Sequence, residues 1–349
     1  AAPGAWIVGP YQVNSGGRTS YFFLSGTSMS SPHVAGAAAL LLEAKPHTPA
    51  QAVRDLLQNT AVPRPLAGSS VPGSLEPVQH QGAGMVDIRA VIAAQSHVVP
   101  GKLALGEMEG RSVTRRLTVT NDSDTDQTFL PANVSAPSTQ PLVFDVILGP
   151  GVASASFTPS ALQVPAGASA ALGVTFTEPA QAAEGSLFGG YVVLTPSGGG
   201  RELRVPYLGM KGDYQRMVAL DPQFSPFGNP LLISGDDLGP SIPITINPGR
   251  FEAAPVVFSL QYSVRRLRLE LFDATSGRAF GRLFEASYFP RNTASGFFYL
   301  FFWQGRDADG ALVAAGDYTL RLSVQKALGE DDNPAHWEVW SSPAITVVY

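Results

Sequence analysis

The sequence contains no cysteine. This absence excludes a disulfide framework, a thiolate nucleophile and zinc sites with cysteine ligands. Charged residues are also scarce, at 15% of the chain against about 25% in an average globular protein. The formal net charge is −5, so there is no basic excess with which to neutralise phosphates. The composition therefore argues against a protein that binds nucleic acid.

Long apolar runs are missing as well. The stretches Val34–Leu42 and Phe297–Trp303 both fall far short of the ~20 residues with which a helix crosses a bilayer. The sequence thus predicts no membrane span. The chain begins at Ala1 without a methionine or a signal-peptide pattern, so we expect it to be a piece of a longer protein.

Glycine and proline are abundant, with 36 and 29 residues, and 44% of the chain is hydrophobic. This balance is typical of folded, turn-rich β structure. The 349 residues are enough for about two or three domains. Residues 1–97 are alanine-rich and helical in rhythm, whereas residues 98–212 and 213–349 show short alternating runs between turns. We therefore predict a multidomain chain in which a helical segment precedes two all-β sandwiches.

Two helix starts are expected in the first zone. Thr48 is predicted as an N-cap, with Pro49 at the first helical position and Gln51 three residues past the cap, which forms a capping box. Asp87 is predicted to cap a further helix over Ile88–Ala94.

Strands are predicted wherever apolar and polar residues alternate between turn clusters. They comprise residues 116–120, 142–146, 170–176, 190–194, 266–272, 296–303 and 318–324. Asp307–Gly310 is predicted as a turn between two of them. The aromatic run Phe297–Trp303 is expected to be a strand buried on both faces, with an exposed binding patch as the alternative.

One segment, Ser25–Gly36, carries a candidate for chemistry. It places Ser28 after a Gly-Thr turn at the start of an alanine-rich helix. Ser28 is expected to be the N-cap, and Pro32 to fall in the first turn, where its missing N–H costs little. The free N–H groups and positive partial charge of a helix N-terminus would stabilise an oxyanion formed beside Ser28. Taken alone, a serine before a helix is an ordinary cap.

The block Gly26–Ser30, followed by Pro32–Gly36, resembles the nucleophile motif of the subtilisin-like serine proteases (subtilases). Ala2–Gly4 resembles the family's segment before the substrate pocket, and Gly82–Asp87 resembles its last strand-to-helix segment. Residues 1–97 are thus similar to the carboxyl-terminal part of a subtilase peptidase domain. The resemblance implies a partial α/β fold, Ser28 as the nucleophile of a Ser-His-Asp triad, protein or peptide substrates, and no cofactor or metal.

The remaining triad members are not in this sequence. In the family the Asp and the His precede the Ser, and the His lies far upstream, whereas 27 residues precede Ser28 here. The family's oxyanion Asn is also far upstream, so Asn14 is too close to match it. His33 is expected to be a packing residue rather than the general base. We expect the chain to be inactive alone, because it lacks the N-terminal part of the catalytic domain.

A non-catalytic protein is the alternative hypothesis. In that case the chain would hold a degenerate protease remnant, and its β domains would bind a partner or a cell wall. An upstream sequence in frame that carries the Asp and His segments would favour the enzyme.

The all-β zones also carry resemblances. Residues 98–212 resemble the fibronectin-type-III-like (Fn3-like) modules of large secreted subtilases, through Thr114–Asn121 and Leu162–Gly167. Residues 213–349 resemble an Ig-like hairpin of surface-associated domains, through Trp303–Gly305 and Gly316–Leu320. These resemblances imply a secreted, extracellular protein, and attachment to a cell wall stays open.

Two glycosylation sequons begin at Asn121 and Asn133, and they would be used only in a secreted eukaryotic protein. The acidic residues Asp307, Asp309 and Glu330–Asp332 fit no complete calcium loop, so solvated turns are expected there.

Overall fold

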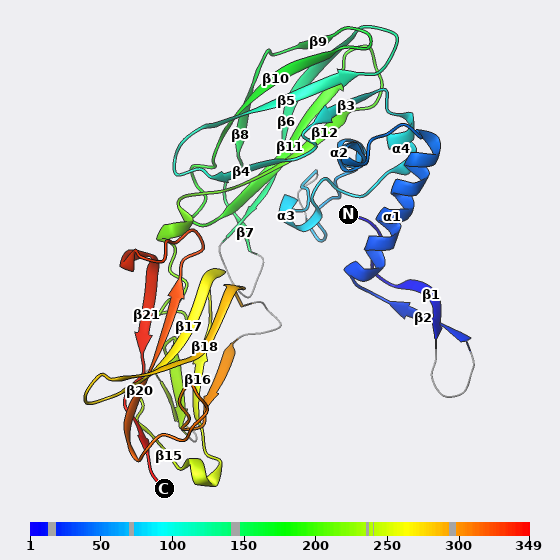
Figure 1. The fold of residues 1–349 in the computed structure, drawn as a ribbon. Coiled ribbons are helices and arrows are strands. Elements are labelled where there is room, and N and C mark those ends of the chain that lie inside the picture. The colour runs from blue at the N-terminus through cyan, green and yellow to red at the C-terminus, as the bar shows by residue number, and fades with distance from the viewer. Residues whose placement is uncertain (13–18, 70–72, 141–146, 235–236, 240, 293–297) are drawn as a thin grey trace. The chain divides into compact units, whose positions relative to one another are not determined.

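The computed structural model describes residues 1–12, 19–69, 73–140, 147–234, 237–239, 241–292 and 298–349. The chain forms two compact units (Figure 1). The first comprises Ala1–Pro141 and Leu148–Gly212, and the second comprises Leu142–Ile147 and Asp213–Tyr349. Among the described residues, no helix is long and apolar enough to cross a membrane.

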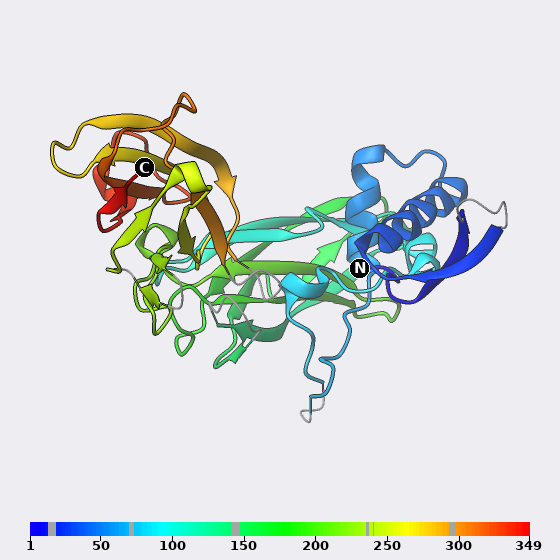
Figure 2. The same cartoon turned by 90° about the horizontal axis from the view of Figure 1, so that it is seen from below.

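The first unit begins with a hairpin and four helices. They are β1 (Ile7–Gln12), β2 (Thr19–Leu24), α1 (Thr27–Ala44), α2 (Ala50–Thr60), α3 (Val78–Gln81) and α4 (Ile88–Ala93). The hairpin lies at the N-terminal end of α1, on the side away from the sheets of this unit (Figures 1 and 2). α1 buries only Ala37 and Leu41, whereas Val34, Leu40 and Leu42 are exposed.

Two predicted helix caps have different outcomes. The Asp87 cap is confirmed, because its Oδ1 accepts a hydrogen bond from the Ala90 N–H at 2.9 Å. The Thr48 cap is wrong, because α2 begins at Ala50 and its N-cap is Pro49. Thr48 instead donates its hydroxyl to the Lys45 carbonyl at 2.8 Å, which closes the preceding turn at the end of α1.

Ten strands build the rest of the first unit. They are β3 (Ser96–Val99), β4 (Leu103–Glu107), β5 (Val113–Asn121), β6 (Gln127–Thr139), β7 (Leu148–Gly149), β8 (Ser154–Thr158), β9 (Leu162–Val164), β10 (Ser169–Thr177), β11 (Leu187–Pro196) and β12 (Leu203–Met210). One sheet has the order β3-β5-β10-β8, and the other has the order β4-β12-β11-β6-β7 with β9 on β6. A single buried core, with Leu117 and Val174 from the first sheet and Val192 and Val205 from the second, joins the two.

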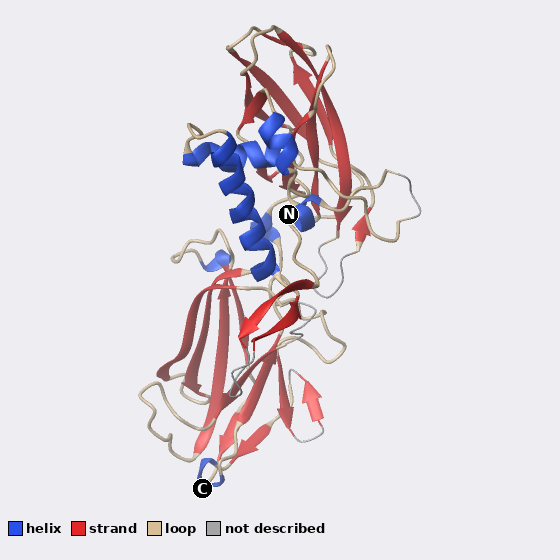
Figure 3. Cartoon of the chain, turned by 90° about the vertical axis from the view of Figure 1, so that its right-hand side faces the viewer, coloured by secondary structure: helices blue, strands red, loops and turns tan. Residues whose placement is uncertain are grey.

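Three strands predicted for this unit, residues 116–120, 170–176 and 190–194, lie within β5, β10 and β11 and are confirmed. The predicted strand at residues 142–146 lies outside the described residues. The helices gather on one side of these sheets (Figure 3).

In the described residues, the second unit has ten strands and three short 3-10 helices. They are η1 (Tyr214–Arg216), β13 (Leu231–Ser234), β14 (Asp237–Gly239), β15 (Ile244–Ile246), η2 (Pro248–Arg250), β16 (Ala254–Phe258), β17 (Val264–Asp273), β18 (Ala279–Phe289), β19 (Tyr299–Trp303), β20 (Gly316–Gln325), η3 (Pro334–His336), β21 (Trp337–Ser341) and β22 (Ile345–Val347). The sheet orders are β14-β13-β16-β19 and β15-β22-β20-β17-β18, with β21 on β20. The predicted turn at Asp307–Gly310 is confirmed, because Asp307 Oδ1 accepts from two backbone N–H groups of this turn.

The aromatic strand β19 corrects one expectation. Trp303 is 2% exposed and belongs to the core of the second unit, but Leu300 and Phe302 are 52% and 55% exposed. The strand is therefore not buried on both faces. β19 pairs only with β16, and within the described residues no element covers the face on which Leu300 and Phe302 lie.

Both sequon asparagines have structural roles that correct the glycosylation expectation. Asn121 is fully buried, and its amide donates to the carbonyls of Thr125, Val164 and Pro165. Asn133 donates to the Ala153 carbonyl and accepts from the Tyr207 hydroxyl at 2.8 Å. A glycan would replace a hydrogen of the donating amide at either residue, and at Asn121 it would have no space in the folded unit.

Candidate functional site

The candidate site is the first turn of α1, which Ser28 occupies as the second helical residue. The helix begins two residues earlier than expected. Its N-cap is Gly26, whose carbonyl accepts from the Met29 N–H at 3.0 Å, so the prediction of Ser28 as the cap is wrong. Because Ser28 lies inside the first turn, its own N–H belongs to the group that has no acceptor within the helix. Its side chain is exposed.

The N-terminal segment fixes this turn from one side. The Gly26 N–H donates to the Gly4 carbonyl at 2.7 Å, and the Trp6 N–H donates to Ser25 Oγ at 2.9 Å. A Cβ atom on Gly4 would overlap with Ser30 Oγ, so only glycine permits this close approach. Gly4 and Gly26 belong to two separate segments of the family resemblance, and the sequence did not indicate that they bind each other.

Pro32 is the sixth residue of α1 and not part of its first turn, which corrects a second expectation about this helix. A proline has no N–H, so residue 32 cannot donate to the carbonyl four residues earlier, which is that of Ser28. The Ser28 carbonyl therefore lacks the hydrogen bond that residue 32 would otherwise donate, although α1 continues to Ala44.

His33 is exposed and points back to its own helix, where its Nδ1 lies 2.7 Å from the Met29 carbonyl. The imidazoles of His80 and His97 instead contact Glu76 and Asp122. Within the described residues, no histidine and no carboxylate forms a hydrogen bond with the Ser28 hydroxyl. The described chain therefore supplies a hydroxyl and a helix N-terminus, and it does not bring a general base to them.

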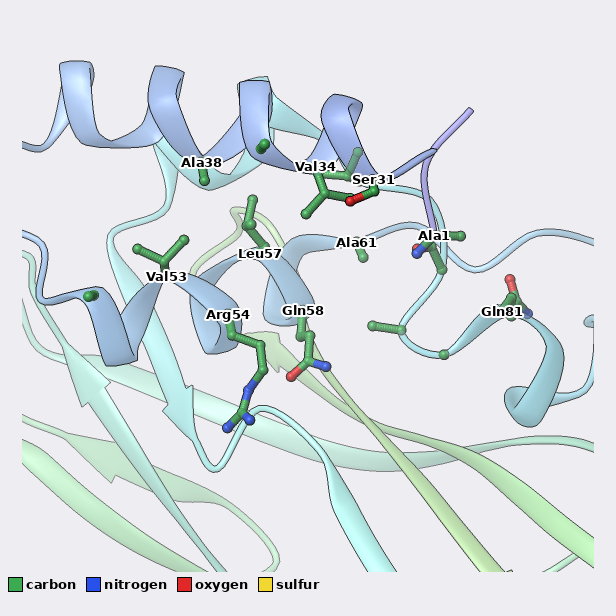
Figure 4. Close-up of a pocket in the computed structure, with 16 residues that line it drawn as sticks. Ala1, Ser31, Val34, Ala38, Val53, Arg54, Leu57, Gln58, Ala61 and Gln81 are labelled. Atoms are coloured by element: carbon green, nitrogen blue, oxygen red, sulfur yellow. The ribbon is translucent and has the colours of Figure 1, made fainter. Parts of the chain in front are cut away.

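A cavity of about 620 Å³ lies along the other side of α1, between this helix and α2 (Figure 4). Val34 and Ala38 of α1 face Val53 and Leu57 of α2 across it. The α-amino group of Ala1 also lines the cavity, and it donates to the Gly84 carbonyl at 2.6 Å. The walls are mainly apolar, so the cavity suits packing rather than proton transfer.

The chemical capacity of this arrangement is limited. A serine hydroxyl is a weak nucleophile unless a neighbouring base takes its proton. In the described part of the chain, no group of three or more His, Asp or Glu side chains is placed to hold a metal ion. What the site does offer is an exposed hydroxyl next to N–H groups that can receive a developing negative charge.

Two families match the chain. Residues 2–84 match the subtilase family, and residues 103–208 match the Fn3-like domain. The first match includes Ser28 and the Gly4–Gly26 contact, and the second covers β4 to most of β12.

Individual relatives agree with this division. The chain is 37% identical over 107 residues to the minor extracellular protease Vpr of Bacillus subtilis, which is 30% of this chain and 13% of that protein. It is 28% identical over 228 residues to the PII-type proteinase of Lactococcus lactis subsp. cremoris, which is 56% of this chain and 12% of that protein. It is 48% identical over 60 residues to subtilisin DY of Bacillus licheniformis, which is 17% of this chain and 20% of that protein. The chain thus spans between 12% and 20% of the length of these curated relatives.

Proposed function

We propose that this chain, which carries a segment of the subtilase family followed by an Fn3-like domain, belongs to a secreted serine endopeptidase whose nucleophile is Ser28. The observation that carries the proposal is the position of Ser28, exposed in the first turn of an 18-residue helix within the matched segment. The names of two relatives, an extracellular protease of Xanthomonas campestris and the minor extracellular protease of Bacillus subtilis, support secretion.

The mechanism follows the serine-triad template. Ser28 Oγ attacks the scissile carbonyl while a histidine outside this chain accepts its proton and later gives it to the leaving amine. An aspartate outside this chain holds that histidine in the correct tautomer. The Ser28 N–H, free of an acceptor within the helix, donates to the oxyanion of the tetrahedral intermediate. Water then releases the acyl group from Ser28 by the same steps in reverse order.

The partner that completes the site is the N-terminal part of the catalytic domain. Helices of an α/β domain bury their apolar sides against a sheet. α1 instead leaves Val34, Leu40 and Leu42 exposed, and an apolar cavity separates it from α2. We therefore propose that the missing part packs on the exposed apolar surface of α1 and brings the His, the Asp and the oxyanion Asn to Ser28. Without it the chain is inactive.

The proposed domain division is residues 1–97 for the peptidase part, 98–212 for an Fn3-like β-sandwich and 213–349 for a second, Ig-like or Fn3-like sandwich. The two sheets around one core in each unit support both sandwiches.

The test uses two proteins, the 349-residue chain and the in-frame product extended toward the N-terminus. Hydrolysis of an unstructured protein such as casein is measured for each. We expect no turnover by the chain and turnover by the longer product, and Ser28→Ala in the longer product should lower kcat by about 10⁶. Ser197→Ala, in the β11–β12 turn, is the matched control and should keep full activity.

Two results would contradict the proposal. Turnover by the chain alone that disappears in Ser28→Ala would show that its base is already present. An extended product without activity, whose sequence contains no upstream Asp and His segments, would favour the non-catalytic binding protein instead.

A further inference from the structure

The central strand β11 of the Fn3-like domain is buried on both faces. Successive residues of a strand point to opposite sides, so Val192 and Leu194 enter the core between the two sheets while Tyr191 and Val193 point outward. Tyr191 and Val193 are nevertheless only 0% and 5% exposed. They form a second apolar cluster with Val78, the first residue of α3. An antiparallel sheet in an independent domain would expose polar residues on this outer face.

Buried polar groups join the same two parts of the chain. Asn59 of α2 is 1% exposed, and its Oδ1 accepts from the Val98 N–H at 2.7 Å. Its amide also donates to the Arg204 carbonyl of β12 at 3.4 Å. The Tyr191 hydroxyl donates to the Gly82 carbonyl after α3 at 3.0 Å. Since a buried polar group without a partner is costly, these bonds fix where α2 and α3 sit on the sheet.

Gly101 allows α2 to lie close to the turn between β3 and β4. A Cβ atom on Gly101, in the turn between β3 and β4, would lie 2.7 Å from the Asp55 Cα and 2.9 Å from Asp55 Oδ1. Its three nearest contacts all come from Asp55 of α2, and Gly101 has no left-handed backbone that would need glycine for another reason. The absence of a side chain at position 101 therefore serves the contact with the helix.

α1 is not held against the sheets in the way that α2 and α3 are. It contacts α2 and α4 and leaves much of its apolar surface exposed, whereas α2 packs on β12 and β3, and α3 packs on β11 and β12. Figure 3 shows the helices of this unit on one side of its sheets. The hydrophobic core for residues 50–97 thus comes from the Fn3-like domain.

We infer that residues 50–97 and the Fn3-like domain fold and unfold as one cooperative unit, in which the outer face of the β6–β11–β12 sheet is a fixed docking surface for the last helices of the peptidase segment. The domain is then a scaffold for this segment and not a tethered module. The inference concerns folding and does not depend on whether Ser28 is a nucleophile.

Amide hydrogen exchange on the 349-residue chain, followed by mass spectrometry in increasing urea below the unfolding transition, tests this without any substitution. We expect peptides from α2, α3 and β11 to open with one free energy and one urea dependence, while peptides from α1 exchange faster. The inference is overturned if α2 and α3 open at lower urea than β11.

Two variants and a control sharpen the test. Gly101→Ala should raise exchange of residues 50–60 and of β12 together, by about tenfold or more, because the added methyl pushes α2 off the sheet. Tyr191→Phe should raise exchange of residues 78–86 and of β11 together, roughly threefold to tenfold, because it removes only the hydroxyl. Gly198→Ala should change neither, since a Cβ atom at this position meets nothing within 4 Å. An effect of Gly101→Ala on α2 alone, with β12 unchanged, would show two independent units.

Discussion

The most direct test of the fold of the first unit is Asn121→Ala. The side chain of Asn121 is fully buried at the end of β5, where its Oδ1 accepts from the Ser123 N–H at 3.1 Å and its amide donates to three carbonyls. Its Oδ1 also accepts from the Ser123 hydroxyl, and alanine removes all five bonds. Those with the Ser123 N–H, the Ser123 hydroxyl and the Val164 carbonyl are fully buried, and the hydroxyl keeps the Thr125 carbonyl as a partner. Each buried group without a partner costs about 1–3 kcal/mol, so the expected loss of unfolding free energy is about 4 kcal/mol.

Differential scanning calorimetry of the 349-residue chain measures this loss. For a unit of this size, about 4 kcal/mol should lower the Tm of the transition assigned to the first unit by about 8–16 °C. Asp124→Ala, at an exposed position of the same turn, is the matched control and should stay within about 0.5 kcal/mol of the wild type. A Tm change below ~2 °C for Asn121→Ala, or a glycan found on Asn121 in folded protein, would refute the role given to this side chain.

Three further outcomes are expected. Binding of 1-anilinonaphthalene-8-sulfonate should be high for the chain and should fall in Leu40→Lys, which replaces an exposed apolar residue. Leu41→Ala, at a fully buried position, should instead lower the free energy of unfolding by about 2–5 kcal/mol. Low dye binding by the wild type would contradict the exposed apolar surface of α1. The hydrogen bond from Arg201, and after it the one from the Ala90 N–H, hold the pKa of Asp87 below its ordinary value of about 3.9. The Asp87–Arg201 ion pair therefore stabilises the fold at pH above that ordinary value. This stabilisation is lost as the pH falls through the lowered pKa. Urea unfolding of Arg201→Ala should therefore differ from the wild type near neutral pH and converge with it at about pH 2, and a constant difference at all pH values would contradict the ion pair. Trp303→Ala should destabilise the second unit by about 3–5 kcal/mol, seen as a shift of its calorimetric transition with the first unit unchanged.

The sequence by itself determined the local features of this protein. The alternation of apolar residues located β5, β10, β11, β17 and β20, because the period of two along a strand needs no knowledge of the partner strand. Asp87 was identified as a cap for the same reason, since its acceptor and the Ala90 N–H lie three residues apart. The match of Gly26–Gly36 to a nucleophile motif also depends on adjacent residues only.

The tertiary structure decided whatever depends on residues far apart in the chain. The N-cap of α1 is Gly26, whose N–H donates to the Gly4 carbonyl, and it lies two residues before the predicted cap Ser28. The sequon at Asn121 satisfies the local pattern, but the fold buries this side chain against the carbonyls of Val164 and Pro165, 43 and 44 residues away. Likewise, the sequence predicts a strand at residues 190–194, and only the fold shows that Val78 of α3 packs on its outward side chains. In each case the deciding free energy comes from burial between segments distant in sequence, and a local pattern does not encode that contact.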